Sequence, residues 1–430
     1  MNSQLLLAGS LAIASLASGA GFTILEQSVS GIGNAFAGGS AAAEDASTMF
    51  YNPAGMTYVS QAEVQGGVHY LELKAKFKND GTTTLATNTA TTGGNADGGF
   101  QTPVPNFYFL QPLTRSLTAG LSVNTPFGLS TDFGKEWVGR YMACRSKILT
   151  VDISPNIAWK ATDKLSLGLG IDCDYVDANL SNAIDLNGDG TPAYDGFSNL
   201  KADDKAVGYH LGAIYQFTPS TRVGISYRSQ IRTHLEGTAD FTLPSSLPGA
   251  LAAAQYVFVD QKVGAQLTLP QSASISVFHN LNDKVDLMAD ITWTDWSSFK
   301  YLDIKFDNAL TESVAGKAIY ENWQDTFRYS IGASYKLTNK LKLRAGTCYD
   351  SNAVRSSYYR SPRIPDASRV WLATGLGWQV TERSSLDFAY VHIFVSDPDI
   401  DNSIHTKNQH LVGTISADMN IVSASYTYTF

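Results

Sequence analysis

The chain has 430 residues, a formal net charge of −8, 44% hydrophobic residues and 36 glycines. Its acidic balance and its lack of a basic tract argue against a nucleic-acid partner. No interior stretch approaches the ~20 consecutive apolar residues that a membrane-spanning helix needs. The 21 tyrosines and 20 phenylalanines instead favour strands with one apolar and one polar face.

Residues 1–19 read as a secretory signal peptide. Leu5 to Leu16 supply an apolar region, and Ala17-Ser18-Gly19 places small residues at the −3 and −1 positions that a signal peptidase reads. No Lys or Arg precedes the apolar run, which departs from the usual pattern. We expect cleavage after Gly19, so that Ala20 begins the exported chain.

Residues 20–60 are rich in Gly, Ala and Ser, do not alternate, and contain a turn at Asn52-Pro53-Ala54. From residue 61 to residue 430 apolar residues alternate with small or polar ones, as in LSLGLGIDCDY at 165–175. A period of two indicates strands whose faces lie in different environments. About fourteen strands are expected, near residues 62–77, 103–111, 116–127, 147–160, 164–178, 204–217, 221–243, 261–280, 284–307, 319–337, 341–350, 369–380, 384–396 and 409–430.

The connections between these strands alternate in length. Short ones lie at residues 111–115, 161–163, 218–220, 281–283, 338–340 and 381–383, and the intervening ones are long and polar. An even number of strands with short turns at one end and long loops at the other is typical of outer-membrane barrels. Such a sheet has to close, because no water in the hydrocarbon layer can satisfy an open edge.

The sequence therefore predicts an all-β transmembrane antiparallel barrel of about 14 strands over residues 61–430. A lumen of that width cannot be filled by side chains alone, so residues 20–60 are expected to plug it as an N-terminal hatch. The final strand ends on Phe430, which resembles the signal read by the outer-membrane assembly machinery. We expect a monomer in the Gram-negative outer membrane, in contact with membrane lipid and lipopolysaccharide.

The segment Asp185-Leu186-Asn187-Gly188-Asp189-Gly190 copies the first half of a calcium loop. Its twelfth position is Gly196 instead of Glu, and a metal-free hairpin turn explains Asp185, Asn187 and Asp189 equally well. Three scattered cysteines predict neither a disulfide framework nor a zinc site. No nucleophile elbow, phosphate loop or paired-histidine motif occurs, so we expect neither an enzyme nor a cofactor.

Several blocks in order resemble the FadL family of fatty acid transporters and aromatic-hydrocarbon uptake proteins. They are Ala20-Gly21-Phe22, SGIGNAFAG (30–38), EDAST (44–48), Asn52-Pro53-Ala54, NTPFGLSTDF (124–133), SYRS (226–229), LPQSASISVFHNL (269–281), TWTDWSSF (292–299) and RIPDASRVWLATGLGW (363–378). The resemblance implies a groove among the extracellular loops, a tighter internal pocket, and a lateral opening in the wall that movement of the hatch connects to that pocket.

The resemblance also implies roles for individual residues. The Phe22 ring would reach the internal pocket together with Leu25, although a disordered terminus is the alternative. The Asn52-Pro53-Ala54 turn would hold the hatch rigidly. Asn124, Pro126, Phe127 and Gly128 would form an inward kink in the third strand, where the proline cannot donate a ladder hydrogen bond.

For the ligand, Arg344 and Arg228 are candidates to bind a carboxylate by charge-assisted hydrogen bonds, and pairing with Asp inside the lumen is the alternative. Leu251 and Phe258 are candidates for the outer groove, and ordinary loop packing explains them nearly as well. A sixteen-carbon tail buries about 12 kcal/mol gross at ~0.8 kcal/mol per methylene. One hydrogen bond to a charged group adds only ~1.5–3 kcal/mol, so the apolar lining should dominate recognition.

These features predict passive uptake of long-chain fatty acids or similar hydrophobic molecules. An aromatic-hydrocarbon channel of the same family, a general hydrophilic porin and an adhesive surface protein are the alternatives.

Overall fold

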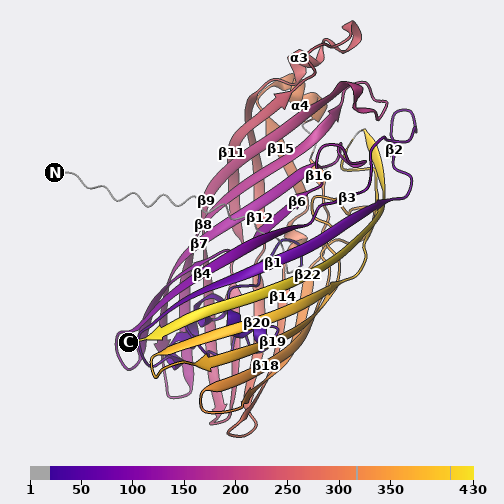
Figure 1. Cartoon of the computed structure of the whole chain (residues 1–430). Helices are drawn as coiled ribbons and strands as arrows, with labels where there is room; N and C mark the ends of the chain where they lie inside the picture. The colour runs from indigo at the N-terminus through magenta and orange to yellow at the C-terminus, as the bar shows by residue number, and fades with distance from the viewer. Residues whose placement is uncertain (1–19, 316–317, 407) are drawn as a thin grey trace, which may run out of the picture.

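The computed structural model describes residues 20–315, 318–406 and 408–430, so the predicted signal peptide lies outside the described residues. Within them, one antiparallel sheet of fourteen spanning strands closes into a barrel (Figure 1), because β1 (Glu63–Asn79) pairs with β22 (Gln409–Thr429) along its whole length. The predicted barrel is confirmed. The other unbroken strands are β4 (Phe100–Pro112), β7 (Arg145–Lys160), β8 (Leu165–Asp185), β9 (Asp195–Thr218), β17 (Thr326–Lys336), β18 (Leu341–Asp350) and β19 (Arg369–Gln379).

Five spanning strands each consist of two pieces separated by a break. They are β5/β6 (Leu117–Asn124, Gly128–Asp132), β10/β11 (Thr221–Arg228, Ile231–Thr242), β12/β13 (Gln261–Leu269, Ser272–Asn280), β14/β15 (Val285–Thr294, Tyr301–Phe306) and β20/β21 (Ser384–Val395, Asp399–Asn402). The sequence predicts unbroken strands across the breaks of β10/β11, β12/β13 and β14/β15, which is wrong, whereas the family resemblance implies the kink between β5 and β6. Pro126, Pro270 and Pro398 lie in three of the breaks, and a proline has no amide hydrogen for a ladder bond.

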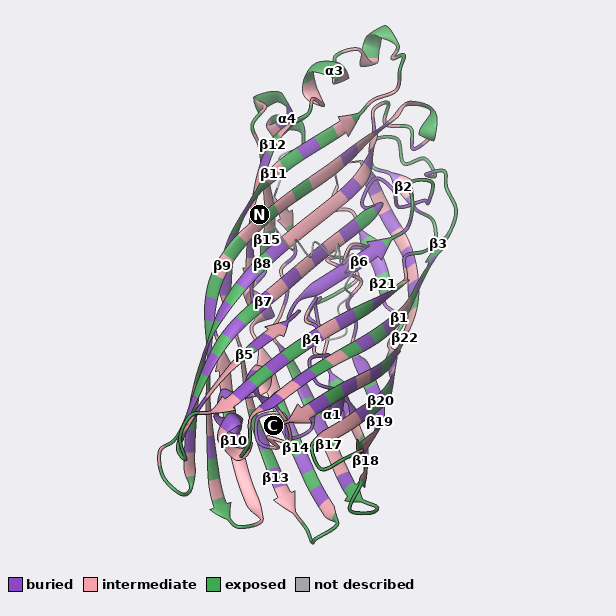
Figure 2. Ribbon diagram, turned by 60° about the vertical axis from the view of Figure 1, so that its left-hand side comes forward, coloured by how far each residue is buried: buried purple, intermediate pink, exposed green. Residues whose placement is uncertain are grey.

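Burial alternates along the strands, as the sequence predicts (Figure 2). Large apolar side chains stand exposed on the outer face, where lipid would contact them; examples are Val68, Phe109, Ile157, Leu169, Tyr215, Ile275, Ile291, Tyr329, Leu372 and Phe388. No described helix has the length and apolar character to cross a membrane. The outer face thus forms the apolar band of an outer-membrane barrel.

The two ends of the barrel differ as expected from the connection lengths. The long loops carry the small elements β2 (Thr83–Thr84), β3 (Ala96–Asp97), η2 (Pro192–Tyr194), η3 (Gly249–Leu251), α3 (Ala254–Val257), α4 (Ala309–Ala315) and β16 (Ile319–Tyr320), whereas η4 (Trp296–Ser298) lies in the break between β14 and β15. Most of these lie at the upper end in Figure 1, and the short turns lie at the lower end. We call these the extracellular and periplasmic ends.

Residues 20–58, called here the N-terminal segment, contain α1 (Val29–Gly33), α2 (Thr48–Tyr51) and η1 (Pro53–Tyr58). Helix α1 contacts β18, β19 and β20, whereas η1 contacts β7, β8 and β9 on the opposite wall. Inward-facing glycines allow this close approach. A Cβ added to Gly212 would lie 1.8 Å from Asn52 Oδ1, and one added to Gly224 would lie 1.7 Å from the Ser40 carbonyl oxygen. The N-terminal segment therefore crosses the lumen.

Candidate functional site

The apolar face of the wall changes sides at two of the breaks, the one between β10 and β11 and the one between β12 and β13. In β10 the exposed apolar residues have odd numbers, such as Ile225, and face outward. In β11 the odd-numbered Ile231 and Leu235 are buried inside the barrel, and the even-numbered Arg232 and His234 face outward. Arg228 is the last inward-facing residue of β10, and Ile231 is the first of β11. These positions are three residues apart, an odd number, so even-numbered residues face inward in β10 and odd-numbered residues face inward in β11.

The same reversal occurs between β13 and β12. Ile275 and Val277 are exposed on the outer face of β13, whereas Val263, Leu267 and Leu269 of β12 are buried inside. The extracellular half of this wall is therefore polar outside and apolar inside.

This inner face surrounds a small apolar cavity of about 60 Å³. Most of its lining is aliphatic or aromatic: Leu129, Ile148, Ala178, Leu180, Leu200, Ala202, Leu235, Val263, Ala265, Leu267, Phe299, Leu302, Ile304 and Ile364. Its volume is well below the ~300–1,000 Å³ of typical ligand pockets. A long alkyl chain can enter only if a neighbouring side chain moves away.

Two charged side chains, Arg363 and Glu321, also line the apolar cavity. The Arg363 guanidinium donates to Ser146 Oγ at 3.1 Å and to Asn182 Oδ1 at 3.4 Å, and no described carboxylate lies within 4.0 Å of it. Burial lowers the pKa of Arg363 to about 10, which leaves it charged at neutral pH. Burial raises the pKa of Glu321 to about 7, although a hydrogen bond from Trp323 and the charge of Arg363 oppose this shift. Burial thus favours the neutral form of Glu321 beside the charged Arg363.

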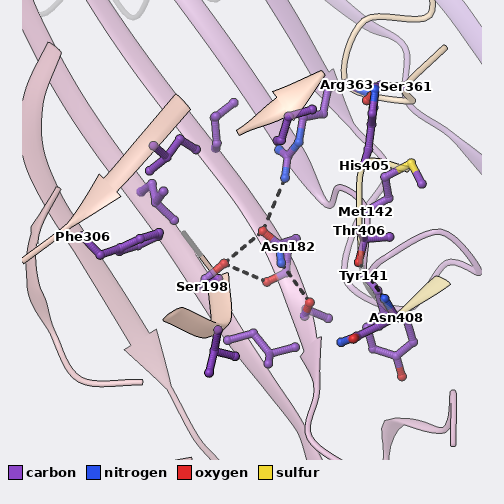
Figure 3. A pocket seen from close by; sticks show the side chains of 18 of the residues that line it. Tyr141, Met142, Asn182, Ser198, Phe306, Ser361, Arg363, His405, Thr406 and Asn408 are labelled. Carbon is purple, nitrogen blue, oxygen red and sulfur yellow. Dashed lines mark hydrogen bonds between the residues drawn. The ribbon is translucent and has the colours of Figure 1, made fainter. Parts of the chain in front are cut away.

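Arg363 also borders a larger outer cavity of about 240 Å³ below the extracellular loops, drawn in Figure 3. There the dashed lines show the Arg363 bond to Asn182, whose side-chain oxygen also accepts from Ser198. Phe258, a predicted groove residue, lines this outer cavity and packs against Phe241 at 5.6 Å between ring centroids. Leu251 lines neither cavity.

Phe22 is fully buried in an aromatic cage beside the apolar cavity, so the alternative of a disordered terminus is wrong. Its ring centroid lies 4.7 Å from that of Trp296, 5.9 Å from Phe299, 6.0 Å from Phe127 and 6.1 Å from Trp323. Phe299 also lines the apolar cavity. Phe299 thus belongs both to the cage around Phe22 and to the lining of the apolar cavity.

The break in the third strand lies directly beside this cage. The β5 ladder to β4 ends at Val123, and no ladder in the described residues joins β4 residues 100–106 to β6. The N-terminal segment bonds to the break instead: Ile24 N donates to the Pro126 carbonyl oxygen and Gly128 N donates to the Phe22 carbonyl oxygen, each at 2.9 Å. The wall is thus unpaired at this place, and the N-terminal segment covers the break from within.

Other predicted residues hold the N-terminal segment. Asn52 Nδ2 donates to three carbonyl oxygens, those of Ser40 at 2.6 Å and of Ala213 and Ile225 at 3.2 Å, and Asn52 Oδ1 accepts from Ala54 N at 3.0 Å. Pro53 follows as the first residue of η1. Gln27 joins the segment to the break, because its Oε1 accepts from Asn124 Nδ2 at 3.1 Å and from Thr125 N at 3.2 Å.

Arg228 and Leu25 line an inner cavity of about 100 Å³ on the periplasmic side of the break. The structure does not bring Arg344 to any of these three cavities. Its guanidinium pairs with Glu44 at 2.9 Å and with Asp387 at 2.7 Å near the periplasmic mouth. Burial would raise the pKa of Glu44, but the charges of Lys342 and Arg344 outweigh burial and lower it below its usual range.

The candidate calcium residues form a hairpin turn between β8 and β9. Asp185 accepts from the amides of Gly188 and Gly190, and Asp189 accepts from the amide and hydroxyl of Thr191. Within the described residues no group of three His, Cys, Asp or Glu side chains is placed to hold a metal ion. Most carboxylate oxygens of the loop thus already accept hydrogen bonds from the loop itself.

Residues 10–430 match the family model described as outer membrane protein transport protein (OMPP1/FadL/TodX). The chain belongs to this family. It is 28% identical to outer membrane protein P1 of Haemophilus influenzae over 430 residues, covering 91% of this chain and 90% of that protein. It is 26% identical to the long-chain fatty acid transport protein of Escherichia coli O6:H1, with 87% of each chain covered.

Solved structures of the family have the same fold. A Pseudomonas aeruginosa FadL homologue superposes with a TM-score of 0.86 at 26% identity, covering 96% of this chain and all of that one. The Pseudomonas putida toluene transporter TodX superposes with a TM-score of 0.68 at 18% identity, covering 90% and 94%. The protein is therefore an outer-membrane transport protein, and its family is one of transporters rather than enzymes.

Sequence reasoning missed the residues that line the apolar cavity and the aromatic cage. Trp296, Phe299 and Arg363 all lie in blocks that carry the FadL resemblance, yet no role was assigned to them. Pro103 and Pro105 were a further missed signal, because a proline has no N–H to donate to a neighbouring strand, so two prolines within one strand favour an unpaired edge. That edge is the unpaired part of β4.

Proposed function

We propose that this protein takes up long-chain fatty acids or closely similar anionic amphiphiles across the outer membrane. The observation that carries the proposal is Arg363, a half-buried cation that has no carboxylate within 4.0 Å in the described residues and lines both the outer and the apolar cavity. The carboxylate of a fatty acid can accept charge-assisted hydrogen bonds from this guanidinium, and its alkyl tail can pack against the aliphatic lining of the apolar cavity. A neutral aromatic hydrocarbon would leave Arg363 unsatisfied.

In this proposal the cargo enters the outer cavity, and its carboxylate meets Arg363. The tail then displaces the Phe22 ring from its cage. Because Phe22 and Ile24 bond to the break at residues 126–128, withdrawal of Phe22 also uncovers the unpaired wall between β4 and β6. The cargo leaves there sideways, and residues 20–60 act as the hatch of a barrel formed by residues 61–430. Residues Asn124 to Gly128 form its exit.

The test of the cargo is binding and uptake of labelled oleate against labelled toluene. Arg363→Gln should weaken oleate binding by roughly 10- to 100-fold, the equivalent of ~1.5–3 kcal/mol for a hydrogen bond to a charged group. Arg145→Gln is the matched control, because Arg145 is exposed on the outer face of β7. Unchanged oleate binding in Arg363→Gln, or toluene uptake without oleate uptake, would overturn the fatty-acid proposal.

The exit has a separate test. Thr23 and Phe127 form an isolated antiparallel bridge of the type without hydrogen bonds between the paired residues, and Cα atoms in such pairs lie about 4.5 Å apart. That spacing accommodates a disulfide. The double variant Thr23→Cys, Phe127→Cys should lose oleate uptake when oxidised and regain it on reduction. Equal uptake in both states would exclude movement of the hatch at this point.

A further inference from the structure

A polar cluster inside the barrel holds helix α2 of the N-terminal segment. His210 of β9 lies at its centre and is 3% exposed. His210 Nδ1 lies 2.7 Å from Asp172 Oδ1. His210 Nε2 lies 3.0 Å from the Met49 carbonyl oxygen in α2 and 2.8 Å from Asn156 Oδ1.

All three partners of the His210 ring are hydrogen-bond acceptors. The Met49 partner is a main-chain carbonyl, and Asn156 uses its amide nitrogen to donate to the Ser154 carbonyl oxygen at 2.8 Å, so its Oδ1 faces His210. Asp172 Oδ1 also accepts from Arg228 at 2.7 Å, and the positive charge of Arg228 favours the ionised carboxylate. Only an imidazolium donates from both ring nitrogens.

Asp172 favours the protonated form of His210, whereas burial and the charge of Arg228 oppose it. The facing groups are Asp152 of β7, Asp172 and Asp174 of β8, and Arg228 of β10, whose Nη1 lies 4.0 Å from Asp152 Oδ2. Asp152 and Asp174 are also directly opposite in the β7–β8 ladder. The N-terminal segment presents only main-chain carbonyls, with Phe50 accepting from Arg228 Nη2 at 3.0 Å. Three acidic side chains and one arginine thus surround His210.

We propose that protonated His210 is a positioning residue that holds α2 of the N-terminal segment against the wall, and that its deprotonation loosens this grip. A neutral imidazole that still donates to Asp172 turns a lone pair toward the Met49 carbonyl and Asn156 Oδ1, so contact with α2 is lost. The grip on the N-terminal segment is therefore present at low pH and weakens as the pH rises. This inference does not depend on which cargo the barrel carries.

The direct test is nitrogen NMR of the full exported chain in detergent, with ¹⁵N-labelled histidine, between pH 5 and pH 9. His210→Gln identifies the resonances of His210. His69 of β1 is the matched control, because it is equally buried but its Nε2 lies 2.7 Å from the donor Asn106 Nδ2. We expect His210 to be an imidazolium at pH 6 while His69 is neutral. A neutral His210 at pH 6 would overturn the proposal.

Amide exchange tests the effect on α2. Protection factors for residues 46–52 should fall about tenfold between pH 6 and pH 9 in the wild type, and those for residues 28–36 should stay constant. Gln carries its amide nitrogen near the place of Nε2 and does not titrate, so His210→Gln should remove the pH dependence, whereas His69→Gln should keep it. If His210 had a purely structural role, protection of residues 46–52 would be independent of pH in the wild type, and His210→Gln would lower it equally at every pH. That result would refute the switch.

Discussion

Strands β10 and β11 carry the same alternation of apolar and polar residues, yet their apolar faces look in opposite directions. In β10, Ile225 faces the lipid, and in β11, Leu235 faces the apolar cavity. The two residues that separate the strands cause the difference. They place the nearest inward-facing residues of β10 and β11 three positions apart, and an odd spacing moves the apolar residues to the other face of the sheet. One repeating pattern can therefore build either a membrane-facing wall or a ligand-facing wall, and a break of two residues decides which.

The largest effect expected from this difference is on stability. An arginine at the lipid-facing Ile225 should lower the free energy of unfolding by ~2–4 kcal/mol, the range for a cation near the middle of a bilayer. An arginine at Thr238, which is exposed on the outer face of β11, should change it by less than about 1 kcal/mol, since polar side chains already stand there. Urea unfolding in lipid vesicles measures both. Equal losses would mean that the membrane also covers β11.

The next effect concerns ligand binding. Leu267→Ala removes part of the cavity lining and should weaken oleate binding about tenfold. Each methylene of the tail that loses its apolar contact costs ~0.8 kcal/mol of binding free energy, so the loss of about two such contacts accounts for this factor. Ile275→Ala, on the outer face of the same spanning strand, should leave oleate affinity unchanged. Titration calorimetry of the two purified variants measures their oleate affinities and shows which face of the strand contacts the cargo. A reversed order of effects would place the cargo on the lipid-facing side.

The alternation, the strand number and the connection lengths could all be predicted from the sequence, because each follows from local patterns and from the requirement for closure. The reversal could not, because the odd positions from Val223 to Ala239 remain largely apolar across the break. The position of Arg363 was equally hidden, since nothing local shows that a loop arginine will reach the inside of a cavity. Arg344 illustrates the opposite error. Its inward direction was foreseen, whereas its partner Glu44 became visible only in the three-dimensional structure.

The smallest effect is on pH dependence. Glu321 has a pKa of about 7, so it is neutral below that pH and becomes negatively charged above it. An ionised Glu321 competes with the cargo carboxylate for Arg363, and oleate affinity should therefore fall a few-fold between pH 6 and pH 8.5. Glu321→Gln should bind oleate with the same affinity across this range. A steeper dependence in Glu321→Gln than in the wild type would show that another group controls binding.

The central claim is that the reversed wall above the breaks forms the path of the cargo. A long-chain fatty acid carrying a photoreactive diazirine in its tail tests this most directly, after irradiation of the protein in lipid vesicles and mapping of the labelled residues by mass spectrometry. We expect labels at Leu235 and Leu267, inside the barrel, and we expect excess oleate to suppress them. Labels confined to Ile225 and Ile275 on the outer face, insensitive to excess oleate, would contradict the account.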